Sequence, residues 1–250
     1  MILIFLLISQ YRFLPAIKVN DDPAGQAFHT TISSGQHSIA ARGDTIYLAY
    51  RGDQTGQANI YFTKSTDGGR TWSPSIRVNY PNQGIFQTLA VSKNGHIFIA
   101  YDDRGPTDDI YFTKSTNGGI SFTTPIRVND IIEGVQKRPS IAVDSSGNKV
   151  FIAWDDIDNI YFSRSTDGGN SFSPSIRVND STLNWQIYPT ICANENGETI
   201  YCAWQDKRNN NDYDIYFAKS VDGGISFGRN VLVNDTNGLS GVDQELPSIA

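Results

Sequence analysis

The chain has 250 residues, of which 39% are apolar and 12% aromatic, and this is enough for a large packed core. Its 20 basic and 26 acidic residues give a net charge of −6, which argues against nucleic acid and anionic lipid as partners. The three scattered histidines and two cysteines offer no metal-ligand spacing, so we expect no metal and no cofactor.

The chain begins with an apolar run, Ile2–Ile8, that is too short to span a bilayer. A run of this length suits the apolar region of a signal peptide, although no Lys or Arg precedes it and no Ala-x-Ala site follows it. A misplaced start codon or a strand fragment is the alternative interpretation of residues 1–10. We expect a signal peptide or leader remnant there, an extracellular or cell-surface location, and no membrane span.

A block of about fifty residues then occurs four times. Each copy contains a segment of the form Ser-x-Asp/Asn-Gly-Gly-x-Ser/Thr-aromatic, and successive copies begin 50, 50 and 55 residues apart. The four segments are Ser65–Trp72, Ser115–Phe122, Ser165–Phe172 and Ser220–Phe227. This self-similarity predicts that residues 11–250 form one repeat domain.

Four extended segments make up each block, and in the first block they are Ser38–Ala40, Thr45–Tyr50, Asn59–Lys64 and Ser75–Asn79. The second is an almost unbroken apolar run, as in a strand covered on both faces, and the third is rich in aromatic residues. The fourth alternates apolar and polar residues, which indicates a half-exposed strand. Because no helical periodicity occurs, we predict an all-β protein, a β-propeller whose blades are four-stranded antiparallel meanders.

The glycine-rich segments join the third strand of each block to the fourth. The Asp side chain accepts hydrogen bonds from backbone N–H groups across such a turn, and glycine takes positive φ without strain. The Ser or Thr hydroxyl meets the carboxylate, and the closing aromatic ring packs beneath. We assign a structural role to four residues of each copy: Ser65, Asp67, Gly69, Trp72, Ser115, Asn117, Gly119, Phe122, Ser165, Asp167, Gly169, Phe172, Ser220, Asp222, Gly224 and Phe227.

These segments resemble the Asp-box, or bacterial neuraminidase repeat, of the sialidase superfamily, and they cover nearly the whole chain. The resemblance implies a propeller fold and, for an intact protein, six blades. It implies little about chemistry, because the same box occurs in sialidases, in some endoglucanases, in receptor ectodomains and in propellers with no known catalysis.

The two ends of the chain match incomplete parts of the repeat. Phe13–Asp21 matches a fourth, outer strand without the turn that precedes it elsewhere, and Leu246–Ala250 matches the start of a first, inner strand. Propellers often close their ring by letting an N-terminal strand complete the last blade. We therefore expect four complete blades plus parts of a further one, truncated at the C-terminus, in an intact protein of five, six or more blades.

Cys192 and Cys202 flank Asn196-Gly197, a pair typical of a two-residue hairpin turn. A cross-strand disulfide would suit an oxidising compartment. Both cysteines occupy positions that are Ala or aliphatic in the sister repeats, which equally suits buried free thiols. Both interpretations stay open.

In an antiparallel meander the loops after the second and fourth strands emerge on the face opposite the glycine-rich turns, and we expect function on that loop face. A single site on a pseudo-symmetric ring must use residues that break the repeat. Charges that obey it, such as Lys64, Lys114 and Arg164, are expected to be structural or solvated. The ligand-binding candidates on the loop face are Arg51, Asp53, Asp102, Asp103, Arg104, Arg138, Asp155, Asp156, Tyr188, Asp206, Arg208 and Glu245.

Acidic and arginine side chains beside aromatic rings suit sugar-acid or polyol recognition, because Arg binds a carboxylate in a bidentate way. The alternative is that these charges pair between neighbouring blades and stiffen the rim. A sialidase would further need three Arg on the ligand carboxylate, a Tyr activated by Glu and an Asp acid/base. The Arg-Ile-Pro motif implied by the family is absent, Arg138-Pro139 is its nearest echo, and no catalytic residue can be assigned.

We predict a secreted, sialidase-like propeller that binds a glycan, a polysaccharide or a protein partner through its loop face. Two alternatives remain open. One is a glycoside hydrolase of exo-α-sialidase type, and the other is a scaffold module of a larger cell-surface protein.

Overall fold

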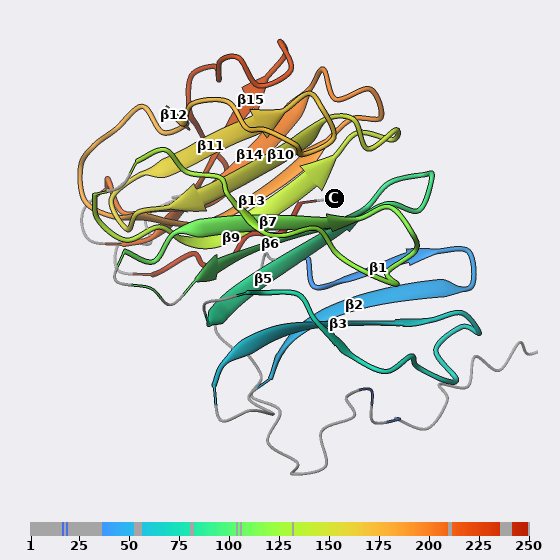
Figure 1. Cartoon of the computed structure of the whole chain (residues 1–250). Coiled ribbons are helices and arrows are strands. Elements are labelled where there is room, and N and C mark those ends of the chain that lie inside the picture. The colour runs from blue at the N-terminus through green and yellow to red at the C-terminus, as the bar shows by residue number, and fades with distance from the viewer. Residues whose placement is uncertain are drawn as a thin grey trace, which may run out of the picture.

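The computed structural model describes residues 17, 19, 37–52, 57–80, 83–103, 105, 107–131, 133–209, 212–235 and 242–249. The leader predicted at residues 1–10 and most of the outer strand predicted at Phe13–Asp21 lie outside these residues. The described part contains four four-stranded antiparallel sheets and no helix, and no segment in it qualifies as a membrane-spanning helix. Figure 1 shows the sheets following one another in chain order.

Each sheet is one blade of the predicted meander. Blade 1 consists of β1 Ile39–Arg42, β2 Thr45–Gly52, β3 Asn59–Ser65 and β4 Ile76–Arg77. Blade 2 consists of β5 Gly84–Val91, β6 Ile97–Asp103, β7 Ile110–Ser115 and β8 Ile126–Arg127. Blade 3 consists of β9 Lys137–Val143, β10 Val150–Asp155, β11 Ile160–Ser165 and β12 Ile176–Arg177. Blade 4 consists of β13 Gln186–Ala193, β14 Ile200–Asp206, β15 Asp214–Ser220 and β16 Val231–Leu232. The fold class predicted from the sequence is thus confirmed.

The outer strands are only two residues long, shorter than the sequence pattern predicts. An asparagine, buried in blades 1 to 3 and half-buried in blade 4, ends each of them by replacing the backbone as hydrogen-bond acceptor. In blade 1 the Oδ1 atom of Asn79 accepts the N–H of Ile60 at 2.8 Å, and Asn129 does the same for Ile110 in blade 2. The side chain therefore takes over from the ladder where the chain turns toward the next blade.

The inner strands of the blades surround a common axis. They line a cavity of about 260 Å³, to which Ile249 of the segment 242–249 also contributes. The carbonyl oxygen of Ile249 lies 3.2 Å from the Nε2 atom of His37, just before the first strand of blade 1. Five inner segments thus meet around one axis within the described residues.

The blades pack face to face through three apolar seams. In the seam between blades 2 and 3, Phe98 and Phe112 pack against Ile152 and Trp154. The middle strands β6 and β10 are buried along their whole length, as predicted for strands covered on both faces. β2 alternates in burial, since the described residues provide it with a neighbouring blade on one side only.

The four glycine-rich segments form the turns between the third and fourth strands, called here the Gly-Gly turns. In the first, Ser65 Oγ donates to Asp67 Oδ1 at 2.7 Å and accepts the N–H of Gly69 at 2.8 Å. Hydrogen bonds from Thr71 and from Ser65 hold the pKa of Asp67 well below its usual range. Asn117 takes the place of the aspartate in the second turn, where it accepts from Ser115 Oγ at 2.8 Å and donates to Ser121 Oγ at 2.8 Å.

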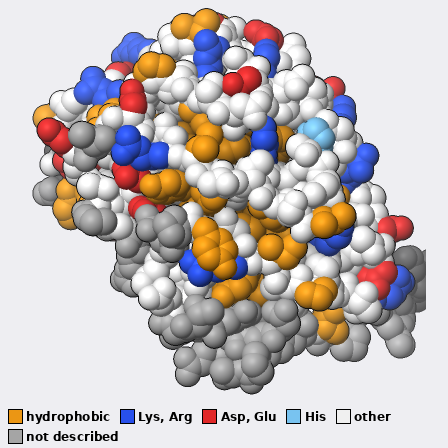
Figure 2. All heavy atoms as spheres, viewed as in Figure 1, with side chains coloured by type: hydrophobic (Ala, Val, Ile, Leu, Met, Phe, Trp, Pro, Cys, Tyr) orange, Lys and Arg blue, Asp and Glu red, His pale blue; other side chains and the backbone are white. Residues whose placement is uncertain are grey.

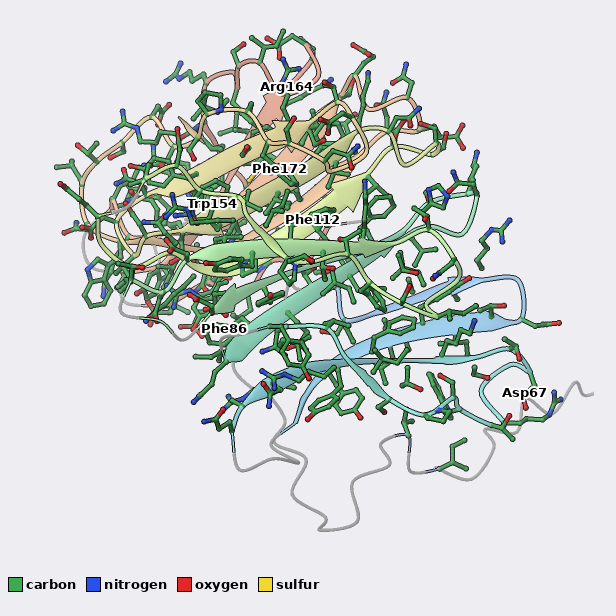
Figure 3. The ribbon with its side chains drawn as sticks, in the orientation of Figure 1. Asp67, Phe86, Phe112, Trp154, Arg164 and Phe172 are labelled. Carbon is green, nitrogen blue, oxygen red and sulfur yellow. The ribbon has the colours of Figure 1, made fainter. Side chains whose placement is uncertain are left out.

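The Gly-Gly turns of blades 2, 3 and 4 also contact the preceding blade. The ring of Phe172 lies 5.1 Å from that of Phe112 in an edge-on arrangement, and the two rings come close together in Figure 3. Lys114 of blade 2 donates to the carbonyl of Gly168 at 2.7 Å. The equivalent pairs Lys64 with Gly118 and Arg164 with Gly223 repeat this bond at 2.6 and 2.8 Å, so the repeated basic residues hold the turns of the next blade. The sequence pattern predicted packing beneath the turn but not this contact across the seam.

Cys192 and Cys202 are free thiols. The register pairs Cys202 with Ile191 and Cys192 with Tyr201, so the two cysteine side chains point to opposite faces of the sheet. Cys192 lines the axial cavity, whereas Cys202 packs in the seam between blades 3 and 4. A disulfide between them is therefore excluded by the register.

Candidate functional site at the loop face

The strands carry the Gly-Gly turns at one end and the candidate site at the other. Figure 3 shows Asp67, in the first Gly-Gly turn, far from Phe86, which lies at the opposite end of the blades. Near Phe86 the inner strands enter the sheets, and the chain passes from the second strand of each blade to the third. The loop face predicted from the meander is therefore the end marked by Phe86.

The inner strands of blades 2, 3 and 4 are irregular where they enter their blades. The pairing register shifts between Gly84 and Gln87 in β5 and between Ile187 and Thr190 in β13, and in blade 3 it shifts between Ala153 and Asp155 of β10, opposite β9. The residues at these shifts are Phe86, Arg138 and Tyr188, and Leu246 takes the equivalent place in the segment 242–249; these four are called the bulge residues. Arg138, Tyr188 and Leu246 have φ of 54°, 56° and 59°, values that ordinary side chains rarely adopt. Such bulges re-aim a side chain out of the sheet.

A second set of equivalent positions lies at the ends of the second strands. Each of them pairs, in its own blade, with the isoleucine near the start of the third strand. We call them the rim residues: Arg51, Asp102, Asp155 and Gln205. Asp102, Asp155 and Gln205 are almost fully buried. Bulge residues and rim residues are thus repeated in position but different in chemistry, which is what a single site on a ring of repeats requires.

Arg138 and Asp155 form a bidentate ion pair inside blade 3. Arg138 Nε donates to Asp155 Oδ2 at 2.8 Å, and the Nη2 atom donates to Oδ1. The guanidinium lies 4.5 Å from the ring centre of Tyr188 in the next blade, whose N–H donates to Asp155 Oδ2 at 3.2 Å. Burial raises the pKa of Asp155, and the hydrogen bonds from Arg138 oppose that rise. The arrangement presents an arginine plane and a tyrosine ring as one rigid unit.

Asp102 occupies the same position in blade 2 but has no arginine partner within the described part of the chain. Its Oδ1 atom accepts the N–H of Phe86 at 2.6 Å, and its Oδ2 atom finds no hydrogen-bond partner among the described residues. Burial, together with the nearby charge of Asp108, raises the pKa of Asp102 to about 8, although the hydrogen bond from Phe86 and the charge of Lys137 oppose the rise. Asp102 is therefore a neutral acid at pH 7 with one open oxygen.

Other buried polar atoms near this end of the blades also lack partners in the part of the chain that the structure describes. They are Arg51 Nε, Gln87 Oε1, Thr190 Oγ1 and Gln205 Oε1. Buried polar groups are normally hydrogen-bonded. Several buried polar atoms without a partner at one end of the blades therefore indicate a binding place for water or a polar ligand.

Arg208 has a different environment from Arg138. It forms a bidentate pair with the buried Asp206, with Nε to Oδ1 at 2.9 Å and Nη2 to Oδ2 at 2.6 Å, and a further bond to Asp180 Oδ1 at 2.6 Å. Its guanidinium lies 4.0 Å from the ring centre of Tyr216. Asp180 comes from blade 3 and also binds the N–H of Asn230 at 3.1 Å, so Arg208 joins the outer parts of two blades.

The remaining sequence candidates are distributed as follows. Asp103 accepts the N–H of Asp109 at 2.8 Å, and Asp156 accepts that of Asn159 at 2.6 Å, so both close their own loops. Glu245 is exposed on the segment 242–249. Asp53 and Arg104 lie outside the described residues.

Tyr213 and Lys207 belong to the site although the sequence analysis did not select them. The N–H of Tyr213 donates to Asp243 Oδ1 at 2.9 Å, and its carbonyl accepts the N–H of Gln244 at 2.6 Å. Burial raises the pKa of the Tyr213 hydroxyl, and the charges of Asp243 and Glu245 raise it further. The repeated X-Pro pairs at Arg138-Pro139, Tyr188-Pro189 and Leu246-Pro247 were the sequence signal for the bulges, but nothing in the sequence marks Tyr213.

No cluster of three or more His, Cys, Asp or Glu side chains suited to a metal ion occurs among the described residues. The surface in Figure 2 mixes acidic, basic and hydrophobic side chains, and neither charge sign dominates that view. The described part of the site is built from arginine, tyrosine and buried acid side chains.

Comparison with known proteins supplies the fold relatives of this chain. No family model matches the sequence, and no curated protein matches it. Among solved structures, an ulvan lyase described as a new family of polysaccharide lyase shares 16% identity over 78% of this chain and 55% of its own, with a TM-score of 0.58. The chain thus spans about half the length of that enzyme.

Two further structures have similar scores. The NanB sialidase from Streptococcus pneumoniae is 12% identical over 88% of this chain and 54% of its own, with a TM-score of 0.60. An α-L-arabinofuranosidase from Fusarium graminearum is 12% identical over 89% of this chain and 72% of its own, also with a TM-score of 0.60. At these identities the likeness concerns the fold. The chain therefore shares the β-propeller fold of proteins that include a sialidase, a polysaccharide lyase and an arabinofuranosidase.

Proposed function

We propose that this chain binds a glycan at the loop face, on the surface formed by the bulge residues and the rim residues. The observation that carries the proposal is the unit of Arg138, Asp155 and Tyr188. Asp155 occupies one edge of the guanidinium and leaves further N–H donors for a ligand, while the Tyr188 ring offers a face for sugar C–H groups. Concave sites that combine aromatic faces with a few fixed polar groups are typical of small-molecule and sugar recognition.

The fold relatives support the same class of ligand. A second ulvan lyase structure contains a bound saccharide of glucuronic acid and sulfated rhamnose. The other relatives include a sialidase and an arabinofuranosidase. For this chain we propose the class of ligand that the ulvan lyase structure contains, a saccharide carrying acidic groups, because Arg138 recognises carboxylate and sulfate well.

The test is titration calorimetry with acidic and neutral saccharides on the folded protein and on the double variant Arg138→Met/Asp155→Asn. The double change removes the charged pair together, so that no unpaired charge stays buried. We expect the variant to keep its fold, checked by circular dichroism, and to bind an acidic saccharide at least about tenfold more weakly. Unchanged affinity in the variant, or no glycan binding by the wild type, overturns the proposal and favours a protein partner or a scaffold role.

A second candidate function is hydrolysis of a sialoside, and it is favoured by Tyr213. The tyrosine hydroxyl lies in the field of Asp243, Glu245 and Arg138, and a tyrosine beside a carboxylate is the nucleophile that a sialidase-type mechanism needs. Hydrolysis of a fluorogenic sialoside by the wild type, abolished by Tyr213→Phe, would establish this activity. Equal rates with the wild type and with Tyr213→Phe would exclude Tyr213 as the nucleophile.

A further inference from the structure

Trp185 is an exposed aromatic residue held in a fixed position. Half of its surface is open to solvent, at 49% relative exposure. The residues at the same place in the repeat are Val135 and Asp243, each followed, like Trp185, by a glutamine. A large ring at a position that breaks the repeat, next to the proposed site, requires an explanation beyond packing.

The backbone beneath Trp185 is tied down on both sides. The buried Gln186 side chain donates to the carbonyls of Leu183 at 2.8 Å and of Asn184 at 3.2 Å. Asn184 adopts a positive φ of 59° and donates to the carbonyl of Lys207 at 3.1 Å, and the N–H of Lys207 donates to the carbonyl of Trp185 at 2.8 Å. These bonds fix the Trp185 loop against the loop that follows β14. An exposed ring on such a rigid base is pre-organised for binding, since little conformational entropy is lost when a ligand stacks on it.

Lys207 lies between two aromatic rings. Its Nζ atom is 5.3 Å from the ring centre of Trp185 and 4.9 Å from that of Tyr213. It forms no ion pair with any residue that the structure describes, whereas Lys137 and Arg138 on the same face pair with Asp108 and Asp155. Lys207 therefore offers a positive charge that no described acidic group neutralises, at the edge of an aromatic surface.

Tyr213 joins this surface to the mouth of the site. Its backbone binds Asp243 and Gln244. Burial and the charges of Asp243 and Glu245 raise the pKa of its hydroxyl, and the nearby charge of Arg138 lowers it. The order across the loop face is thus Trp185, Lys207, Tyr213 and then the pair of Tyr188 and Arg138. A ligand that reaches from Trp185 to Arg138 extends past Lys207 and Tyr213, which suits an oligosaccharide.

We infer that Trp185, Lys207 and Tyr213 form a second subsite, so that the ligand of this chain is an acidic polysaccharide rather than a single terminal sugar. One sugar stacks its C–H face on the Trp185 indole, with its carboxylate on Lys207, while another sugar of the same chain occupies Arg138 and Tyr188. This inference rests on the proposed function and deepens it.

The experiment measures affinity against chain length by calorimetry, with glucuronic acid and with glucuronate oligosaccharides of two and four units. It uses the full chain and the variants Trp185→Ala and Lys207→Gln, with Leu183→Ala as a matched control because Leu183 is an exposed apolar residue of the same loop. In the wild type we expect the tetramer to bind at least about tenfold more tightly than the monosaccharide. Trp185→Ala should abolish this gain and leave monosaccharide binding unchanged, and Leu183→Ala should change neither.

A neutral oligosaccharide of the same length separates charge from stacking. Lys207→Gln should weaken the acidic tetramer and leave a neutral tetramer unaffected. Binding that is sensitive to the double variant of Arg138 and Asp155 but shows no dependence on length, or a length gain that survives Trp185→Ala, overturns the second subsite and leaves the proposed function standing. Absence of binding at every length overturns both.

Discussion

Asp102 is a buried carboxyl group whose second oxygen lacks a hydrogen-bond partner among the described residues. Phe98 and Ala100 of the same strand pack in the seam between blades 2 and 3, and alternation places Asp102 on that face. At the equivalent buried position of blade 3, Asp155 forms an ion pair with Arg138, whereas Asp102 stays protonated. Departures of this kind from ordinary burial rules are expected at functional sites.

The protonation of Asp102 makes stability depend on pH. The pKa is about 8 in the folded chain against an ordinary aspartate value of 3.8, so the folded state binds more protons between these two pH values. The free energy of unfolding therefore falls as pH rises through that window, by at most about 1.4 kcal/mol per pH unit.

Replacing Asp102 by Asn removes this pH dependence. We expect Asp102→Asn to be more stable than the wild type at pH 7, by about 1–4 kcal/mol, and to lose that advantage near pH 4. Urea unfolding from pH 4 to pH 8 measures the difference. Asp155→Asn is the control, since it leaves Arg138 without its carboxylate and should lower stability at pH 7; a stability gain for Asp102→Asn that is the same at pH 4 and pH 7 would contradict the assignment.

The Gly-Gly turn is the element that links one blade to the next. Its serine and aspartate close the turn internally, while its second glycine lies against an aromatic ring of the preceding blade. A Cβ atom on Gly169, which has φ of 81°, would overlap the ring of Phe112, whereas one on Gly168, with φ of 70°, would come no closer than 3.5 Å to its nearest neighbour, the oxygen of Gly147. Gly168 is thus restricted to glycine by its backbone conformation alone, whereas Gly169 is restricted by its conformation and by the ring of Phe112.

This difference predicts unequal effects of alanine at the two positions. Gly168→Ala carries only the strain of a left-handed conformation, about 1–2 kcal/mol. Gly169→Ala adds overpacking against Phe112, about 1–3 kcal/mol more. Thermal unfolding of the two variants measures the gap, and equal losses would show that the close approach to Phe112 does not restrict the turn.

At the scale of the whole molecule, stability depends on seams between blades that repeat the same contacts. Each seam has an apolar cluster, a basic side chain on a glycine carbonyl and an edge-on ring pair. The seam between blades 3 and 4 adds Arg208, which holds the buried Asp206 and reaches Asp180 in the neighbouring blade. Arg208 thus has the environment of a brace, although it was selected from sequence as a ligand candidate.

Arg208→Gln should therefore destabilise the protein without changing glycan affinity. Loss of the guanidinium leaves Asp206 buried and uncompensated, which costs about 3–5 kcal/mol. The double variant Arg208→Gln/Asp206→Asn should recover much of this loss. Chemical denaturation with parallel calorimetry checks both parts, and a loss of acidic saccharide binding in the folded double variant would return Arg208 to the ligand site.

The sequence by itself determined the number and order of strands in each described blade and the chemistry of the Gly-Gly turns. These features depend on local patterns, namely period-two alternation, unbroken apolar runs and a turn motif that recurs every fifty residues or so. It also separated repeated charges such as Lys114 from charges that break the repeat, such as Arg138.

Only the tertiary structure decided which of the repeat-breaking charges face one another. The pairing of Arg138 with Asp155, the bond from Arg208 to Asp180, and the meeting of Tyr213 with Asp243 depend on how strands and blades pack and on bulges that turn single residues to positive φ. These contacts join residues at least 17 positions apart in the chain, and a shift of one residue in a strand would turn each side chain to the other face. Local sequence patterns do not determine which of these side chains contact each other.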